Sequence, residues 1–266
     1  MANDTIYRRP EDYDLEHEGD ERDIEFYREL VVRLRPRRML ELACGSGRLT
    51  IPLAEAAPEM TVVGVELSGE MLELARRKLA DAGPDLGRRV TLHSGDMRTW
   101  SSSTDFDLVL LGCSSITHLL TLDDRLAVWR RAHALLAPGG RFVIDVTMPD
   151  IGVFAASLET PPRALVEIDR DQRDPSGDER LVRSRTTTYD ALEQRTHVRF
   201  LYDKFRKDRP VDRYVSDFDG YVYFPGELRL LFMHTGFTVE AVWSDYTFHA
   251  AHARARELVM MGKKLA

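Results

Sequence analysis

The sequence predicts an α/β fold, a doubly wound, Rossmann-like and mostly parallel sheet with an antiparallel β insertion late in the chain. An apolar strand over 39–42 runs into a glycine turn and then a helix. Apolar strands continue to alternate with amphipathic helices up to about residue 148, and strand-like polar/apolar alternation replaces this pattern over 163–223. Strands that alternate with helices are typical of a parallel sheet covered by helices. Alternation along consecutive strands is typical of antiparallel pairing.

Helix boundaries in the first half are marked by capping residues. Asp20, Ser68 and Thr121 each precede an amphipathic segment, and short polar side chains at such positions accept hydrogen bonds from the first free amides of a helix. A Pro-Gly-Gly run over 138–140 ends the last of these helices. The expected elements are a helix over 21–34, a strand over 39–42, a helix over 49–57, a strand over 61–66, a helix from Ser68 to Leu79, a loop over 81–87, strands over 90–93 and 106–111, a helix over 122–136 and a strand over 141–146.

The second half divides into an insertion and a closing segment. Three or four antiparallel strands are expected between 163 and 223, with a turn over 174–178. Pro225 is expected to start a helix that Gly236 ends, and strands over 238–243 and 257–263 follow. We therefore expect one domain from 1–150 and 225–266, and an antiparallel insertion from 151–224.

Composition excludes several classes of function. The chain has 266 residues, 43% of them hydrophobic, and a formal net charge of −7, so no basic field would gather nucleic acid. No run approaches the roughly 20 apolar residues of a membrane helix, and the polar start of the chain does not resemble a signal peptide. Cys44 and Cys113 form neither a disulfide framework nor a metal-binding pattern. These features predict a cytoplasmic protein without a metal, a membrane partner or a nucleic-acid partner.

Acidic residues follow the first three strands of the predicted sheet. Glu41 ends the first, Glu66 the second and Asp96 comes after the third, and Glu66 lies 19 residues after Gly47. In open α/β sheets ligands bind at the carboxyl ends of the strands, and an acid at this spacing accepts hydrogen bonds from ribose hydroxyls. Taken singly, each acid is equally well explained as a cap of the following helix or turn. Together they favour a ligand that contains adenosine.

The glycine turn indicates which kind of ligand this is. Gly45-x-Gly47-x-x-Thr50 lacks the third glycine of a dinucleotide-binding turn, and Glu41 is a poor neighbour for phosphate but suits a cationic ligand. Glu41-Leu42-Ala43-Cys44-Gly45-Ser46-Gly47 resembles the first motif of class I S-adenosylmethionine-dependent methyltransferases. The later motifs of that family resemble Val65-Glu66-Leu67-Ser68, Gly95-Asp96-Met97 and Leu136-Ala137-Pro138-Gly139-Gly140.

The resemblance implies a set of cofactor contacts. Glu41, Ala43 and Gly45 would hold the methionine part, Gly47 would let the chain approach it, and Leu111 and Gly112 would pass beside it. Glu66 would take the ribose hydroxyls, and Leu67, Met71, Asp96 and Met97 would surround the adenine. For Leu67, Met71 and Leu111, ordinary core packing is the competing interpretation. Tyr13 and Tyr27 would belong to an N-terminal helical lid over the cofactor, although Tyr27 also fits a core-facing position on its helix.

The segment after the fourth strand is where the methyl group should point. Gly112 to Leu119 is similar to a stretch of glycine N-methyltransferase-like and antibiotic-tailoring small-molecule methyltransferases in which a histidine lines the site. His118 is therefore the candidate general base or acceptor-orienting residue. The alternative is a histidine that bonds to backbone at a helix entry. Cys113 is not expected to act as a nucleophile.

The end of the insertion could recognise a substrate. It carries clustered aromatic and charged side chains, which strand packing or a dimer contact would explain equally well. These are Arg213, Tyr214, Asp217, Tyr221 and Tyr223.

The sequence thus predicts methyl transfer from S-adenosyl-L-methionine to a nitrogen or oxygen of a small molecule by direct in-line displacement, with the insertion as a substrate cap or a homodimer contact. A natural-product or amino/sugar-type acceptor is implied by the resemblance alone. Two alternatives remain open: a cofactor-binding relative that does not methylate, and an NAD-dependent oxidoreductase. The acceptor atom and the substrate are not determined by the sequence.

Overall fold

The computed structural model describes residues 5–159 and 166–265. The chain divides into two compact units. The larger comprises Arg22–Met148 and Tyr223–Ala266, and the smaller comprises Met1–Glu21 and Pro149–Val222. The expected boundaries at 150 and 224 lie close to this division. The structure assigns the first 21 residues to the unit that holds the antiparallel strands.

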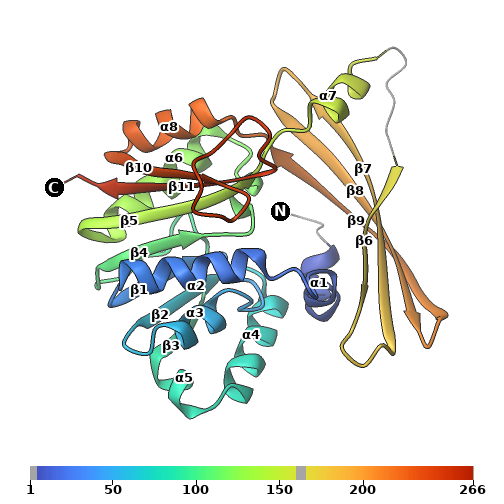
Figure 1. Ribbon diagram of the computed structural model, residues 1–266, viewed down its shortest axis with the longest axis horizontal. Helices are drawn as coiled ribbons and strands as arrows, with labels where there is room; N and C mark the ends of the chain where they lie inside the picture. Colours follow the sequence, from blue (N-terminus) through green and yellow to red (C-terminus); the bar gives the residue numbers. More distant parts are fainter. Residues whose placement is uncertain (1–4, 160–165, 266) are drawn as a thin grey trace. The chain divides into compact units, whose positions relative to one another are not determined.

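The larger unit contains a mostly parallel sheet with strand order β10-β11-β5-β4-β1-β2-β3 (Figure 1). Its strands are β1 (Arg38–Leu42), β2 (Thr61–Glu66), β3 (Val90–Ser94), β4 (Phe106–Leu111), β5 (Leu136–Thr147), β10 (Phe237–Ser244) and β11 (Glu257–Lys264). Pairs among β1 to β5 are parallel, and β11 runs antiparallel to both of its neighbours. The chain leaves β1 toward β2 on one side and returns to β4 on the other. The carboxyl ends of β1 and β4 therefore form the topological switch point, where open α/β sheets bind ligands.

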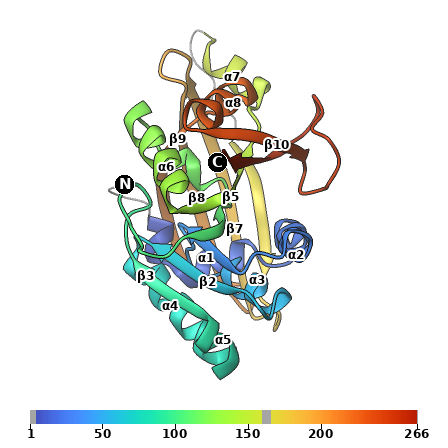
Figure 2. The same cartoon turned by 90° about the vertical axis from the view of Figure 1, so that its left-hand side faces the viewer.

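Helices cover both faces of this sheet. They are α2 (Arg22–Leu34), α3 (Thr50–Ala56), α4 (Gly69–Asp81), α5 (Pro84–Arg89), α6 (Leu122–Leu135) and α8 (Pro225–His234). Adjacent residues of β5 separate the two faces: the Phe142 ring contacts Trp129 of α6 and Phe232 of α8, whereas Val143 belongs to the cluster that contains α2. Figure 2 shows α8 beside β10 and α6 beside β5.

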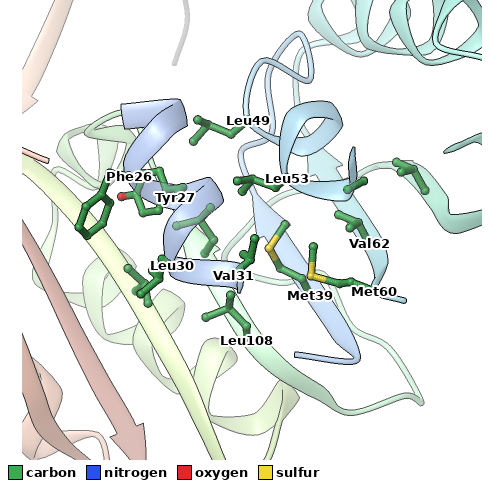
Figure 3. Close-up of a cluster of buried hydrophobic side chains, with 14 of the residues drawn as sticks. Phe26, Tyr27, Leu30, Val31, Met39, Leu49, Leu53, Met60, Val62 and Leu108 are labelled. Atoms are coloured by element: carbon green, nitrogen blue, oxygen red, sulfur yellow. The ribbon is translucent and has the colours of Figure 1, made fainter. Parts of the chain in front are cut away.

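The face covered by α2 and α3 holds the main apolar cluster. Tyr27, Leu30 and Val31 of α2 meet Met39 of β1 and Leu53 of α3, and each is at most 2% exposed (Figure 3). The spacing of the three α2 residues places them on one side of the helix. At about 25 cal/mol per Å² of buried apolar surface, such side chains dominate the stability of this unit. They also fix α2 beside the strand ends that matter for the site.

The smaller unit is a four-stranded antiparallel sheet with helix α1 on it. Its elements are η1 (Thr5–Arg8), α1 (Pro10–Glu16), α7 (Ile151–Ser157), β6 (Val166–Arg173), β7 (Glu179–Asp190), β8 (Arg195–Arg206) and β9 (Arg209–Tyr221), with strand order β6-β7-β8-β9. Buried acids attach α1 to the sheet. Glu16 accepts from Arg183 at 2.9 Å and from the Tyr202 hydroxyl at 2.8 Å, and Asp12 pairs with Lys204 at 2.6 Å.

The expected fold class is confirmed, and most expected elements are present. The Ser68 hydroxyl caps α4 by accepting from the Met71 amide, and Thr121 caps α6 by accepting from the Asp124 amide. Two segments differ from expectation. Helix α5 occupies most of the expected loop, because Pro84 starts a short helix. β5 begins at Leu136, directly after α6, so the Pro-Gly-Gly run lies within the strand. Among the described residues no helix has the length and apolarity needed to cross a membrane.

Candidate active site

The glycine turn after β1 lies at the switch point in a strained backbone conformation. Ala43, Gly45 and Gly47 have φ values of +55°, +56° and +76°. This left-handed region favours glycine. A Cβ atom on Gly45 would lie 3.2 Å from the end of the Met71 side chain. Glycine at position 45 therefore suits both the backbone conformation of the turn and the close packing of Met71 against it.

Glu41 is buried beneath this turn. Glu41 is only 3% exposed, and its Oε2 accepts a 2.5 Å hydrogen bond from the Thr50 hydroxyl of α3. Burial raises the pKa of Glu41 to about 8, because the charged form loses its hydration, although the Thr50 hydrogen bond and Arg48 oppose this effect. Without a ligand, Glu41 is therefore mainly protonated at neutral pH.

Glu66, at the end of β2, is turned toward the loop backbone. Its Oε1 accepts from the amides of Leu67 and Ser68 at 2.9 and 2.7 Å, and its Oε2 accepts from the Gly45 amide at 2.9 Å. A carboxylate has about four acceptor positions, so this conformation leaves one, on Oε2. One ribose hydroxyl fits that position. A second requires the carboxylate to give up a backbone amide.

Asp96 is held by a neighbouring arginine. The Arg98 guanidinium donates to both carboxylate oxygens, with Nη2 at 2.6 Å from Oδ2, and its Nη1 also donates to Asp124 at 2.7 Å. The hydrogen bonds from Arg98 lower the pKa of Asp96. Asp96 is therefore ionised and half-buried at the end of the β3 segment. An adenine amino group there would share the carboxylate with Arg98.

The apolar residues expected around the cofactor lie in two environments. Leu67 is 46% exposed, which is unusual for a leucine that follows a buried strand and leaves its side chain available to a ligand. Met71 and Leu111 are 2% and 0% exposed, so their side chains are part of the core. Met97 is half-buried, and Gly112 is buried at the end of β4.

The segment after β4 carries the candidate catalytic histidine. A 3-10 helix, η2 (Ser115–His118), follows Gly112, and the Tyr223 hydroxyl donates to the Ile116 carbonyl of η2 at 2.9 Å. His118 ends this helix and is half-buried. Burial lowers the pKa of His118 to about 4. Its imidazole is therefore neutral at pH 7 and keeps one nitrogen as an acceptor.

Arg48 links the glycine turn to α2 and to the segment after β4. Its guanidinium donates to both oxygens of Asp23, and Nη2 lies 3.4 Å from the Cys113 sulfur. Burial raises the pKa of Cys113 to about 12. The thiol is therefore uncharged, which agrees with the expectation that Cys113 is not a nucleophile.

The tyrosines expected to form a lid have partners elsewhere. Tyr27 is 1% exposed in the core, and its hydroxyl donates to Asp145 at 2.6 Å. Tyr13 lies on α1 in the smaller unit, with its ring centroid 4.6 Å from that of His17. Contact of either residue with a cofactor stays a prediction. For Tyr27, the alternative of a core-facing helix residue describes the observed position.

The expected substrate residues are spread over both units. Tyr223 belongs to the larger unit, 1% exposed. In the smaller unit Tyr214 stacks on Tyr202 at 4.7 Å and donates to Asp12 at 2.9 Å, Arg213 pairs with Asp203, and Tyr221 is 7% exposed. Strand packing accounts for the contacts of Tyr214 and Arg213. Their role in substrate recognition stays a prediction.

Three residues at the switch point were not singled out from the sequence: Asp23, Arg48 and Asp145. Asp145 is a single acid in the otherwise apolar run Phe142–Val146, and it is 0% exposed. A charged residue in the centre of a buried strand is the signal that would have found it. Asp23 and Arg48 are separated by most of α2 and β1, and their sequence positions carry no comparable signal.

Comparison with known proteins finds a family match within the larger unit. Residues 39–140 match the family model described as "Methyltransferase domain". This stretch of the larger unit is therefore similar to a methyltransferase domain. The chain is 37% identical over 141 residues to the dTDP-3-amino-3,6-dideoxy-alpha-D-glucopyranose N,N-dimethyltransferase of Streptomyces fradiae, a match that covers 50% of this chain and 51% of the relative. The chain spans about half the length of the curated relatives it matches.

Solved structures share the fold over nearly the whole chain. The CcbJ methyltransferase of Streptomyces caelestis superposes with a TM-score of 0.76 at 24% identity and covers 95% of this chain and 96% of its own. The sugar N-methyltransferase KedS8 of Streptoalloteichus sp. superposes with a TM-score of 0.69 at 20% identity, covering 96% and 91%. These structures share the fold, and together with the family match over residues 39–140 and the sequence relatives they confirm the resemblance to class I S-adenosylmethionine-dependent methyltransferases inferred from the motifs.

Proposed function

We propose that this protein transfers a methyl group from S-adenosyl-L-methionine to the amine of a small molecule, with an amino sugar as the acceptor class. The observation that carries the proposal is the set of polar groups at the carboxyl edge of β1, β2 and β4. Three neighbouring strands contribute to this set: Glu41 is buried near the end of β1, Glu66 ends β2, and the neutral His118 comes after β4. The name of the Streptomyces fradiae relative supports an amino sugar, since that enzyme dimethylates one.

The residues at this edge fit the proposed cofactor. Positive φ angles at Gly45 and Gly47 turn the backbone sharply at this edge, Glu41 beneath it suits a cationic group, and Glu66 keeps one acceptor position for a ribose hydroxyl. The exposed Leu67 side chain would cover one face of the adenine. When bound, S-adenosylmethionine supplies a methyl group on a sulfonium, whose carbon–sulfur bond breaks as the acceptor nitrogen bonds to the carbon.

His118 would orient the acceptor rather than take its proton in a fast step. With a pKa of about 4, a neutral imidazole is a weak base, but its unprotonated nitrogen is a hydrogen-bond acceptor that can take an N–H hydrogen bond from a neutral amine and direct the lone pair. The proton that the methylated nitrogen must lose then passes to solvent. Positioning of this kind supplies much of the acceleration in an in-line displacement.

Calorimetric titration with S-adenosylmethionine, S-adenosylhomocysteine and NAD tests the cofactor. We expect both sulfur nucleosides to bind and NAD not to bind. Binding of NAD alone would overturn the proposal and favour an oxidoreductase.

Mass spectrometry after incubation with dTDP-linked amino sugars, and with hydroxyl counterparts as controls, tests the transfer. Cofactor binding without a mass gain of 14 or 28 Da on any acceptor would favour a relative that does not methylate.

Two variants of His118 test its role. His118→Asn keeps an acceptor group and His118→Ala removes it, so we expect kcat to fall on the order of tenfold more in His118→Ala than in His118→Asn. The affinity for S-adenosylhomocysteine should change little in either. Equal kcat values for both variants and the wild type would remove His118 from the mechanism.

The assembly and location predicted from the sequence are part of this proposal. We infer a homodimer through the antiparallel sheet, supported by the edge strand β6, where Val166 and Ile168 are 70% and 69% exposed. Light scattering at working concentration tests this inference. We expect a dimer mass for the wild type and a monomer mass for Ile168→Lys. A monomer mass for the wild type would contradict the homodimer. A cytoplasmic location stays a prediction.

A further inference from the structure

Asp145 is a fully buried carboxylate that the proposed transfer reaction does not use directly. It lies near the end of β5, is 0% exposed, and accepts hydrogen bonds from the Tyr27 hydroxyl at 2.6 Å, the Cys113 amide at 2.9 Å and the Ser114 amide at 2.5 Å. Burying a charge without partners is very unfavourable. Here the partners are a phenol on α2 and two consecutive backbone amides of the segment after β4.

Those two amides belong to a strained turn. Cys113 and Ser114 have φ values of +54° and +53°, a left-handed conformation that is unfavourable for a residue with a Cβ. The backbone just before the turn packs closely on the Leu49 side chain, because a Cβ atom on Gly112 would lie 2.7 Å from it. Hydrogen bonds from a carboxylate to both amides offset this strain. Asp145 therefore selects the left-handed turn over an extended path.

The same turn determines where η2 begins. Ser115 follows directly as the first residue of η2, and the Tyr223 hydroxyl donates to the carbonyl of Ile116, the second residue. The Ser114 hydroxyl also accepts from the Thr147 amide at 3.0 Å, which fixes the turn to the end of β5. The path from Leu111 to His118 is thus held by Asp145 at its start and by Tyr223 at its middle.

We propose that Asp145 is a positioning residue for methyl transfer: by accepting from the Cys113 and Ser114 amides, it holds the turn after β4 in the conformation that presents His118 to the acceptor. This inference rests on the proposed function. Asp145 itself, without exposed surface, touches neither the acceptor nor the cofactor. It acts through the backbone of the turn.

Asp145→Asn is the direct test. Asparagine has the same shape, but its NH2 group must face one of the backbone amides that donate to the Asp145 carboxylate. Two donors that face each other cannot form a hydrogen bond, which favours release of the turn. We expect kcat per folded molecule, at saturating cofactor and acceptor, to fall on the order of tenfold or more. The matched control is Phe232→Leu, a core substitution on the opposite face of the sheet, against Phe142. It should lower the melting temperature while leaving kcat per folded molecule within about threefold of wild type.

Rescue by glycine separates conformation from general stability. Glycine adopts the left-handed region without the Cβ penalty. Asp145→Asn should therefore lower kcat less in a Ser114→Gly background than in the wild-type protein. Measured against Ser114→Gly alone, the loss should be smaller by about threefold or more. A kcat for Asp145→Asn within threefold of wild type would overturn the proposal, as would the absence of any rescue.

A second readout does not depend on turnover. Cys113 lies in the turn, whereas Cys44, the other cysteine, is 4% exposed beneath the glycine turn. Release of the turn in Asp145→Asn should speed modification of Cys113 by a thiol reagent by about tenfold or more, and Phe232→Leu should not. Unchanged Cys113 reactivity in Asp145→Asn contradicts the role of Asp145. If the wild-type protein transfers no methyl group, the proposed function fails, and the thiol measurement still decides whether Asp145 holds the turn.

Discussion

The Thr50 hydroxyl donates a 2.5 Å hydrogen bond to the Glu41 carboxyl group, which is 3% exposed below the glycine turn. This contact joins the end of β1 to the first residue of α3, the two elements that flank the turn. Burial raises the pKa of Glu41 to about 8 despite this hydrogen bond. Glu41 therefore carries a proton at pH 7 in the absence of a cation, and this has consequences for binding and for stability.

Binding of the proposed cofactor should release a proton. A cationic group placed near Glu41 favours its charged form and lowers its pKa, so on the order of one proton should leave at pH 7. Titration with S-adenosylmethionine in buffers of different ionisation enthalpy measures this number from the buffer dependence of the heat. Glu41→Gln should bind without that dependence. Wild-type binding with the same heat in every buffer would contradict a protonated Glu41.

The stability of the ligand-free protein should fall with pH because of the same residue. The pKa of Glu41 is raised from 4.5 to about 8 on folding, so the folded state binds the proton more tightly than the unfolded state. Stability from this group is complete below pH 4.5 and is lost as the pH rises toward 8. Glu41→Gln removes the ionisation, so its melting temperature relative to wild type should rise between pH 5 and 8.5, by on the order of 5 °C. A constant difference over this range would show that Glu41 does not titrate there.

Glu66 should matter for cofactor affinity through two sets of hydrogen bonds. Glu66→Ala removes the acceptor for the Gly45, Leu67 and Ser68 amides as well as the ribose contact, and S-adenosylhomocysteine affinity should fall about tenfold or more. Calorimetry measures the loss. The control is Glu73→Ala on the exposed side of α4, which should bind as wild type does. Unchanged affinity in Glu66→Ala would refute the ribose assignment.

The sequence predicted the fold and the positions of the acids because both depend on local patterns. Strand and helix periodicity, the Ser68 and Thr121 caps and the glycine turn are each visible within about ten residues. Which partners the acids take is decided by side-chain conformation and by distant segments. Asp96 pairs with Arg98 and through it reaches Asp124, and the Glu66 carboxylate turns toward backbone amides rather than outward.

The hydrogen-bond partners of Tyr27 and Asp145 could not be predicted for a related reason. The periodicity of α2 places Tyr27 on the core face, but its hydroxyl finds a partner 118 residues away on β5. Asp145 acquires its role only because β4 and β5 are adjacent and the turn after β4 has left-handed residues. Tertiary contacts of this kind leave no short-range pattern.

The buried ion pair of Arg48 and Asp23 should be more important for structure than its surface counterparts. The side chains are 13% and 9% exposed, and the pair joins the glycine turn to α2. Arg48→Met leaves the Asp23 carboxylate buried without its cation, which typically costs about 3–5 kcal/mol of unfolding free energy. The double variant Arg48→Met/Asp23→Asn removes that uncompensated charge, so it should be more stable than Arg48→Met alone. Urea unfolding of the two variants measures the difference.

Arg33→Met, which breaks the exposed pair with Glu29, is the control and should cost less than about 1 kcal/mol. Additive losses from Arg48→Met and Asp23→Asn would mean that the two side chains act independently and that the turn is held by its own backbone.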